Sequence, residues 1–145
     1  VVHGIKSVLP YMLQSGKGHI VNVASMAGKI GSAKGSAYSA TKHAVLGLTH
    51  CLRQELIGTG VRISAVNPGP VDTPFFDIAD PGGQYKKNVG FFMLRPERVA
   101  DEIVKVLRKG KAESDIPFAA ALGVKLYQLF PRLLDKMYAK ILNKK

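Results

Sequence analysis

Two side chains suited to proton transfer stand one helical turn apart. Tyr38 and Lys42 lie in a stretch with helical periodicity, so their four-residue spacing places both on one helix face. A tyrosine by itself is a slow acid at neutral pH, but a neighbouring ammonium stabilises its phenolate and favours proton transfer. Ser25 ends a short apolar segment and is expected to donate a hydrogen bond to the oxygen that Tyr38 protonates. The three residues predict acid–base chemistry at a carbonyl oxygen that becomes an alkoxide.

Alternating strands and helices are needed to position these residues. In chain order the patterns predict a helix over 1–13, a strand over 19–25 that is buried on both faces, a helix over 37–58, a strand over 61–66, a helix over 96–110, a short strand over 114–118 and two amphipathic helices over 119–143, interrupted at Pro131. This alternation predicts an α/β fold with a parallel sheet. Ligands of such sheets bind beyond the carboxyl ends of the strands, where Ser25 and the Asn67–Gly69 turn are expected.

Length and composition are those of one ordinary globular domain. The chain has 145 residues, 46% of them hydrophobic, and a formal net charge of +11. One cysteine excludes an internal disulfide, and the four histidines have no metal-binding spacing. The scattered basic residues come without a nucleic-acid-binding motif, so no nucleic-acid partner is expected. With no apolar run of 18–20 residues and no signal peptide, a cytoplasmic protein is expected.

Around these residues the sequence resembles the short-chain dehydrogenase/reductase family. The resemblance covers about the first 110 residues and is carried by three segments, 18–28, 37–42 and 61–73. Their order is specific: a strand, Ser25, a glycine-rich loop, Tyr38 and Lys42 on a helix, a second strand, and an Asn-Pro-Gly turn. The distance of thirteen residues from Ser25 to Tyr38 fits the family spacing.

The resemblance implies a role for each matching residue. Ser25 would position the substrate, Tyr38 would be the general acid and base, and Lys42 would assist Tyr38 and bind the nicotinamide ribose. The cofactor would be NAD or NADP, and the residues expected beside its nicotinamide are Pro68, Gly69, Val71 and Thr73. The implied activity is hydride transfer between this cofactor and a carbonyl or alcohol. The Phe-rich segment 75–94 is expected to cover a small apolar substrate.

The resemblance also implies that one half of the family's domain is missing. The glycine-rich dinucleotide-binding turn that opens family members has no match here. We therefore expect residues 1–145 to be the C-terminal, catalytic and substrate-binding half of one Rossmann-like domain, with an open edge on its first strand. By itself this chain is expected to be inactive. The alternative hypothesis is a truncated, reductase-like chain without catalysis that acts as an interaction or dimerisation module.

Two surfaces suggest partners. Small side chains on the 37–58 helix form a stripe interpreted as packing residues: Ala40, Ala44, Gly47 and Cys51. In the family this helix and the first one, over 1–15, often pair with a second subunit, which implies a homo-oligomer. The divergent amphipathic extension over 111–145 is similar to a bacterial subgroup of uncharacterised oxidoreductases of the family. Its basic end is compatible with a membrane surface, but covering of the protein's own substrate lobe or of a subunit contact is favoured.

Overall fold

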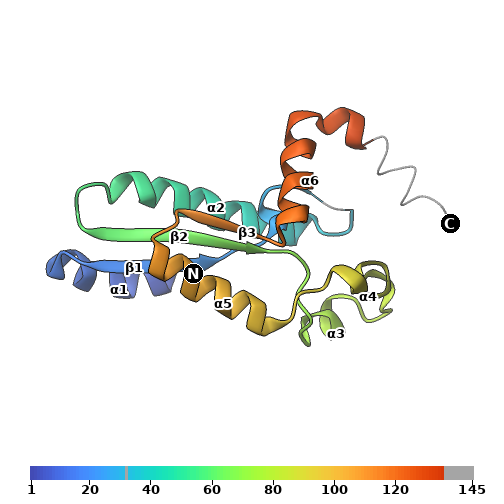
Figure 1. Ribbon diagram of the computed structural model, residues 1–145, viewed down its shortest axis with the longest axis horizontal. Coiled ribbons are helices and arrows are strands. Elements are labelled where there is room, and N and C mark those ends of the chain that lie inside the picture. The colour runs from blue at the N-terminus through green and yellow to red at the C-terminus, as the bar shows by residue number, and fades with distance from the viewer. Residues whose placement is uncertain (32, 136–145) are drawn as a thin grey trace.

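A computed structural model describes residues 1–31 and 33–135 of the chain (Figure 1). Its elements in chain order are α1 (Val2–Ser15), β1 (Gly18–Val23), the 3-10 turn η1 (Met26–Gly28), α2 (Ser36–Glu55), β2 (Val61–Pro68), α3 (Phe75–Ala79), α4 (Gln84–Val89), the 3-10 turn η2 (Gly90–Phe92), α5 (Pro96–Lys109), β3 (Glu113–Ile116) and α6 (Phe118–Leu129). The predicted α/β class is confirmed. Within the described part, no helix is long and apolar enough to cross a membrane.

The sheet has three parallel strands in the order β1-β2-β3. Gly18 of β1 pairs with Val61 of β2, and Ala65 of β2 pairs with Glu113 of β3. Because all strands run in one direction, their carboxyl ends lie at one edge of the sheet, where the candidate residues were expected. Among the described residues β1 has a neighbour on one side only, so it is an edge strand of this sheet.

Helices cover both faces of this sheet. Side chains of α1 and α2 pack around Ile63 on one face, with Ile5 and Leu56 in the same cluster. On the other face, α5 packs against Val66 through Val99 and Val106. In Figure 1, α5 accordingly lies in front of the strands and α2 behind them. The crossover from β1 to β2 runs through α2 on one face of the sheet, and the crossover from β2 to β3 runs through α5 on the other face. Because the strand order advances in one direction, the two crossovers have opposite hands, and one of them departs from the right-handed rule.

Glycines fix the turn that leads from α2 into β2. Gly58 and Gly60 have φ values of 83° and 78°, in the left-handed region that other residues avoid. A Cβ on Gly60 would also collide with the carbonyl oxygen of Gly16 after α1. The helix α2 itself ends at Glu55, three residues before the bound of 58 that its pattern predicts.

Two packing predictions differ from the structure. The stripe on α2 does not pack within the chain, because all four members, Ala40, Ala44, Gly47 and Cys51, are exposed, and its place in a subunit contact stays a prediction. The strand β1 was predicted to be buried on both faces, but most of it is half-buried and Val23 is exposed, because it lies at the open edge. Of the apolar residues that repeat along α1, Ile5 is buried, whereas Val8 and Leu13 are exposed.

The chain after residue 111 is partly sheet and partly helix. Glu113–Ile116 form β3, so the extension begins with an integral strand. The predicted interruption at Pro131 is confirmed, since α6 ends at Leu129 and helical backbone resumes at Pro131. The remainder of the second predicted helix, over 136–143, lies outside the described residues.

Candidate active site

The first two turns of α2 carry Tyr38 and Lys42. Tyr38 is 40% exposed, and the Lys42 Nζ atom lies 5.6 Å from the centroid of the phenol ring. The same Nζ donates a hydrogen bond of 3.4 Å to the carbonyl oxygen of Val23, the last residue of β1. Lys42 therefore links Tyr38 to the carboxyl end of the first strand, where the sequence placed the chemistry.

Lys42 is partly withdrawn from water in this position. Burial lowers the pKa of its ammonium below the ordinary value, because the charged form loses hydration. A positive charge near low-dielectric protein acts more strongly on its neighbours than one in bulk water. The arrangement is chemically able to stabilise a negative charge on the neighbouring phenol.

Ser25 lies at the same edge of the sheet, directly after β1. Its Oγ accepts a hydrogen bond from the backbone N–H of Ala27 at 3.1 Å and so caps η1. The hydroxyl donates to the carbonyl oxygen of Pro68, at the end of β2, over 3.4 Å. The buried Ser25 thus joins the ends of the first two strands, which the parallel arrangement brings together.

A close backbone contact holds η1 and its cap Ser25, here called the serine turn, against α2. A Cβ on Gly28, the last residue of η1, would lie 2.8 Å from the carbonyl oxygen of Lys42 and 2.9 Å from Leu46 Cδ1. Such distances exclude any side chain unless η1 moves away from α2. The absent side chain of Gly28 therefore sets how closely Ser25 approaches the helix that carries Tyr38.

Among the described residues no hydrogen bond joins Ser25 to Tyr38, because the Ser25 hydroxyl is directed to Pro68. The Tyr38 ring instead packs against Phe75, with 5.7 Å between ring centroids. Phe75 in turn lies edge-on to Phe76, 5.3 Å away. The helix α3 of the segment 75–94 thus lies next to Tyr38.

The Pro68–Gly69 turn is held by the third strand. The backbone N–H of Gly69 donates to the carbonyl oxygen of Ile116 at 2.7 Å. A Cβ on Gly69 would lie 3.3 Å from Pro117 Cδ, so the two chain segments are in close contact. The turn therefore has a fixed position at the carboxyl edge of the sheet.

Val71 lies beyond this turn and forms an isolated bridge with Leu94. The bridge consists of a hydrogen bond from Leu94 N–H to Pro70 O, 2.8 Å, and one from Asp72 N–H to Leu94 O, 2.9 Å. The N–H of Val71 takes no part in either bond. The Thr73 hydroxyl donates to the carbonyl oxygen of Val71 at 3.5 Å.

Sequence reasoning missed a polar cluster beneath the turn. Lys29 Nζ lies 2.6 Å from Asp115 Oδ2 and 2.7 Å from Glu113 Oε1. The Asn67 amide donates to Glu113 Oε1 at 2.6 Å and to Asp115 Oδ1 at 2.7 Å. His50 of α2 completes the cluster, 3.0 Å from Glu113 Oε2. The residue after η1 is thereby tied to α2, β2 and β3, next to the Pro68–Gly69 turn.

Charge complementarity stabilises this cluster. Burial alone would lower the pKa of Lys29, but its hydrogen bonds to Asp115 and Glu113 and their negative charges outweigh burial and raise it. Burial alone would raise the pKa of Glu113, but hydrogen bonds from Lys29, His50 and Asn67 and the Lys29 charge hold it below its ordinary value. No sequence motif announces the cluster, because Lys29 and its partners lie more than eighty residues apart.

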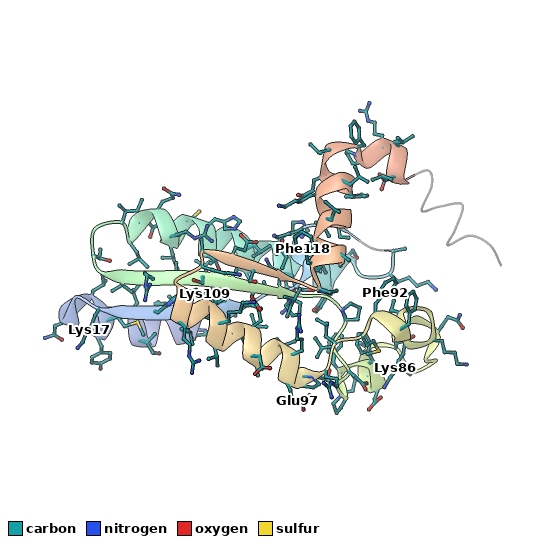
Figure 2. All side chains as sticks on the ribbon, viewed as in Figure 1. Lys17, Lys86, Phe92, Glu97, Lys109 and Phe118 are labelled. Atoms are coloured by element: carbon teal, nitrogen blue, oxygen red, sulfur yellow. The ribbon has the colours of Figure 1, made fainter. Side chains whose placement is uncertain are left out.

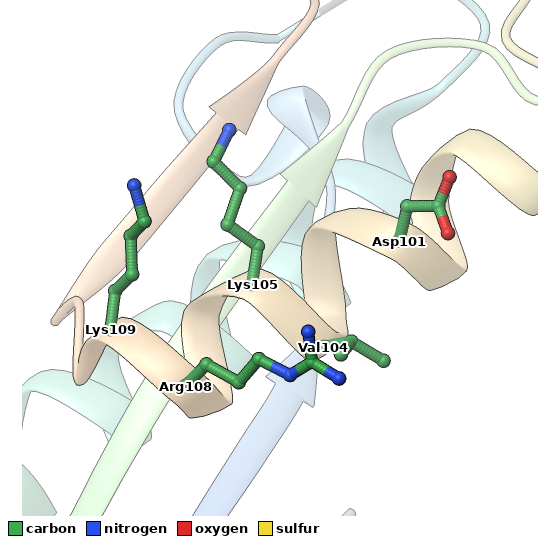
Figure 3. A pocket seen from close by; sticks show the side chains of 5 residues that line it. All are labelled: Asp101, Val104, Lys105, Arg108 and Lys109. Atoms are coloured by element: carbon green, nitrogen blue, oxygen red, sulfur yellow. The ribbon is translucent and has the colours of Figure 1, made fainter.

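Two hollows lie away from the candidate residues. One, lined by Lys29, His43, His50, Glu113 and Gln128 among others, adjoins the polar cluster. The other is a furrow of about 380 Å³ on the exposed side of α5 (Figure 3), lined by Asp101, Val104, Lys105, Arg108 and Lys109. All five of its residues come from one helix. Ser25, Tyr38 and Lys42 line neither hollow.

Comparison with known proteins finds relatives of this arrangement. A family model described as short chain dehydrogenase matches residues 1–81. An uncharacterised oxidoreductase of Staphylococcus epidermidis is 36% identical over 106 residues, which cover 73% of this chain and 43% of the relative. A short chain dehydrogenase/reductase from Burkholderia phymatum in complex with NAD superposes with a TM-score of 0.79 at 25% identity, covering 92% of this chain and 55% of that one. The closed form of a serine dehydrogenase complexed with NADP+ superposes with a TM-score of 0.71 at 31% identity, covering 79% and 50%.

The chain spans about half the length of the curated relatives it matches. The matched residues 1–81 include Ser25, Tyr38, Lys42 and the whole Pro68–Thr73 segment. The solved structures share its parallel sheet with flanking helices. More than half of the chain fits the family model, and the chain therefore belongs to the short-chain dehydrogenase family.

Proposed function

We propose that this chain is the catalytic half of an oxidoreductase that transfers a hydride between NAD or NADP and a carbonyl or alcohol substrate. The observation that carries the proposal is the Lys42 ammonium beside the exposed Tyr38 ring, at the carboxyl end of a parallel strand. The related structures contain NAD in one case and NADP+ in another, which supports a nicotinamide cofactor without choosing between the two.

The residues present fit part of such a cofactor. The Val71 N–H stands outside the bridge with Leu94 and is suited to a carboxamide oxygen. The fixed Pro68–Gly69 turn would support the nicotinamide ring, with Thr73 nearby, and the Lys42 ammonium would bind the ribose hydroxyls. When bound, the nicotinamide would supply or accept the hydride at its C4 atom.

The chain's own residues handle the proton. In the direction of reduction, Tyr38 gives its hydroxyl proton to the carbonyl oxygen as the carbonyl carbon gains the hydride, so the C=O π electrons become the new O–H bond. Lys42 stabilises the phenolate that remains, until solvent returns a proton. Ser25 turns its hydroxyl from Pro68 toward the substrate and donates a hydrogen bond to the developing alkoxide.

An apolar substrate fits the surroundings of Tyr38. Phe75 packs on the Tyr38 ring and Phe76 packs on Phe75, so the surface that α3 presents beside Tyr38 is aromatic. Such a surface stabilises apolar substrate groups by burial and gives no compensation to a charged one. The complete protein is therefore expected to reduce apolar ketones or aldehydes faster than keto acids.

The exposed surfaces of α1 and α2 support a homo-oligomer. Small side chains along α2 are exposed, and α1 exposes the large apolar Tyr11 as well. A Cβ on Gly47 would meet nothing within 4 Å, so Gly47→Arg changes the surface without disturbing the chain itself. We expect this variant to elute as a smaller species than the parent in size-exclusion chromatography with light scattering. An unchanged mass would exclude α2 from the subunit contact.

The catalytic proposal is tested with a pair of matched tyrosine variants in the complete protein. Tyr38→Phe removes one hydroxyl from the site, and Tyr11→Phe removes one from an exposed ring on α1. Loss of general acid catalysis typically costs about 10²–10⁴ in rate. We expect Tyr38→Phe to lose NAD(P)H-dependent turnover to that extent and Tyr11→Phe to retain it. Turnover of Tyr38→Phe within a few-fold of the parent would overturn the mechanism.

Cofactor titration separates catalysis from a purely structural role. Fluorescence titration of the 145-residue chain and of the complete protein with NADH and NADPH is expected to show tight binding in the complete protein only. If the complete protein bound neither nucleotide, the chain would act without hydride transfer, and the proposal would fail.

A further inference from the structure

The C-terminal helix α6 is apolar on two opposite sides. One side is made of small residues and packs on the serine turn, where Ala121 and Val124 contact Met26 with Ile30 beside them. This contact anchors α6 at the carboxyl edge of the sheet. In Figure 1 the helix rises away from that edge of the sheet.

The outward side carries large apolar residues. Phe118, Leu122, Leu126 and Leu129 are 81%, 61%, 51% and 72% exposed. Their spacing of four, four and three positions places them on one helix face, here called the α6 stripe. Figure 2 shows the Phe118 side chain at the start of this face. A contiguous patch of this kind marks an interaction surface, because water is a poor solvent for it.

Positive charge accompanies the α6 stripe. Lys125 is exposed and lies at its border by helical position. From Phe118 to the last residue the sequence holds six cations, Lys125, Arg132, Lys136, Lys140, Lys144 and Lys145, against one acid, Asp135. That acid accepts a hydrogen bond from Tyr127 at 2.7 Å. Residues 136–145 lie outside the described structure and enter here by composition alone.

The charge pattern selects among possible occupants. In a symmetric dimer the same patch faces itself, so a stripe bordered by Lys125 would bring like charges together. Covering of the protein's own substrate lobe does not fit either, because the residues of α6 that pack inward do so on Met26 and Ile30 rather than on 75–94. A membrane surface with anionic headgroups offers an apolar layer for the stripe and negative charge for Lys125 at the same time.

We propose that the α6 stripe binds the surface of an anionic lipid membrane, with the helix lying in the interfacial plane and not crossing it. The large apolar side chains enter the acyl boundary, and Lys125 extends its ammonium to the headgroups. This inference goes beyond the proposed hydride transfer and is independent of it, since its readout is vesicle binding.

Vesicle co-sedimentation tests the proposal with two double variants. Leu122→Ser with Leu126→Ser removes half of the α6 stripe. Ile57→Ser with Val104→Ser removes two exposed apolar side chains elsewhere and is the matched control. The protein and both variants are pelleted with phosphatidylcholine vesicles that contain or lack phosphatidylserine, and circular dichroism checks that each is folded.

The parent and the control are expected to pellet with phosphatidylserine vesicles, and the stripe variant to bind about tenfold more weakly or worse. Lys125→Gln is expected to weaken binding about fivefold, and added salt to weaken it further. Equal binding by the stripe variant, equal binding to vesicles without phosphatidylserine, or no binding by the parent would each overturn the proposal. Self-association that the stripe variant abolishes, without vesicle binding, would show that a second copy occupies the stripe.

Discussion

The single lysine that neutralises two carboxylates next to the Pro68–Gly69 turn gives the sharpest stability prediction. Lys29 Nζ lies 2.6 Å from Asp115 and 2.7 Å from Glu113, and both carboxylates also accept from one Asn67 amide. Lys29→Met keeps the length of the side chain and removes its charge. Two carboxylates then share one amide donor without a cation between them.

The burial of the cluster sets the magnitude. Removing one partner of a buried ion pair costs about 3–5 kcal/mol, and exposed pairs contribute about 0.2–1 kcal/mol. The Lys29, Glu113 and Asp115 side chains are 17%, 23% and 15% exposed, between those limits and nearer the buried one. We therefore expect Lys29→Met to lower the free energy of unfolding by about 2–3 kcal/mol at neutral pH.

The pH dependence has a definite sign. In the parent the pKa of Glu113 is lowered from 4.5, so its contribution to stability is present above pH 4.5 and is lost as the pH falls through the folded value. In Lys29→Met the two carboxylates repel, which raises the pKa of one of them in the folded state. Acid then raises the free energy of unfolding of the variant relative to neutral pH, so the difference in this free energy between parent and variant becomes smaller.

Urea denaturation followed by circular dichroism at about pH 7 and about pH 5 measures both effects. The control is Lys17→Met, which removes an exposed lysine that forms no ion pair within the described residues. A loss below about 0.5 kcal/mol in Lys29→Met, the level of an ordinary surface substitution, would refute the reasoning. A difference in the free energy of unfolding between parent and Lys29→Met that is larger at about pH 5 than at about pH 7 would also refute it.

Three further substitutions probe other contacts by the same urea assay. Gly28→Ala places a Cβ 2.8 Å from an α2 carbonyl oxygen and is expected to lose about 1–3 kcal/mol. Gly47→Ala, where a Cβ meets nothing, should instead gain about 0.5–1 kcal/mol, and equal effects would contradict the close-contact argument. Thr49→Val leaves the buried Asn22 amide without its 2.8 Å acceptor and should cost about 1–3 kcal/mol, with Thr49→Ser largely retaining stability. Burial and then the Arg62 charge lower the pKa of His19 from 6.5, so the contribution of His19 to the free energy of unfolding is complete above pH 6.5 and is lost as the pH falls. His19→Gln should therefore flatten the dependence of the free energy of unfolding on pH in acid. An unchanged slope would remove His19 from the acid response.

Local patterns predicted the elements that carry the candidate residues. Tyr38 and Lys42 share a helix face because a four-residue spacing does so in any helix. Ser25 and Pro68 meet at one edge because short apolar segments joined through a helix form parallel strands. Such relations depend on neighbours in the chain, which the sequence displays directly.

Which face of each helix is covered could not be predicted in the same way. The small stripe that includes Cys51 has the period of a packed surface, yet α2 packs on the sheet through Leu46 and Leu52 and leaves the stripe exposed. On α6 the small Ala121 and Val124 are buried, and the larger apolar residues are not. Periodicity groups residues on a face, but the neighbouring element decides whether that face meets protein.

From the sequence alone follow the alternation of strands and helices, the family resemblance and the one-turn spacing of Tyr38 and Lys42. Only the tertiary structure decided that Lys29 meets Glu113 and Asp115, that Ser25 turns toward Pro68 and that the α6 stripe is exposed. The physical reason is the distance along the chain over which each effect acts. Backbone propensity and periodicity act over a few residues, whereas burial and charge pairing depend on segments that folding brings together from more than eighty positions away.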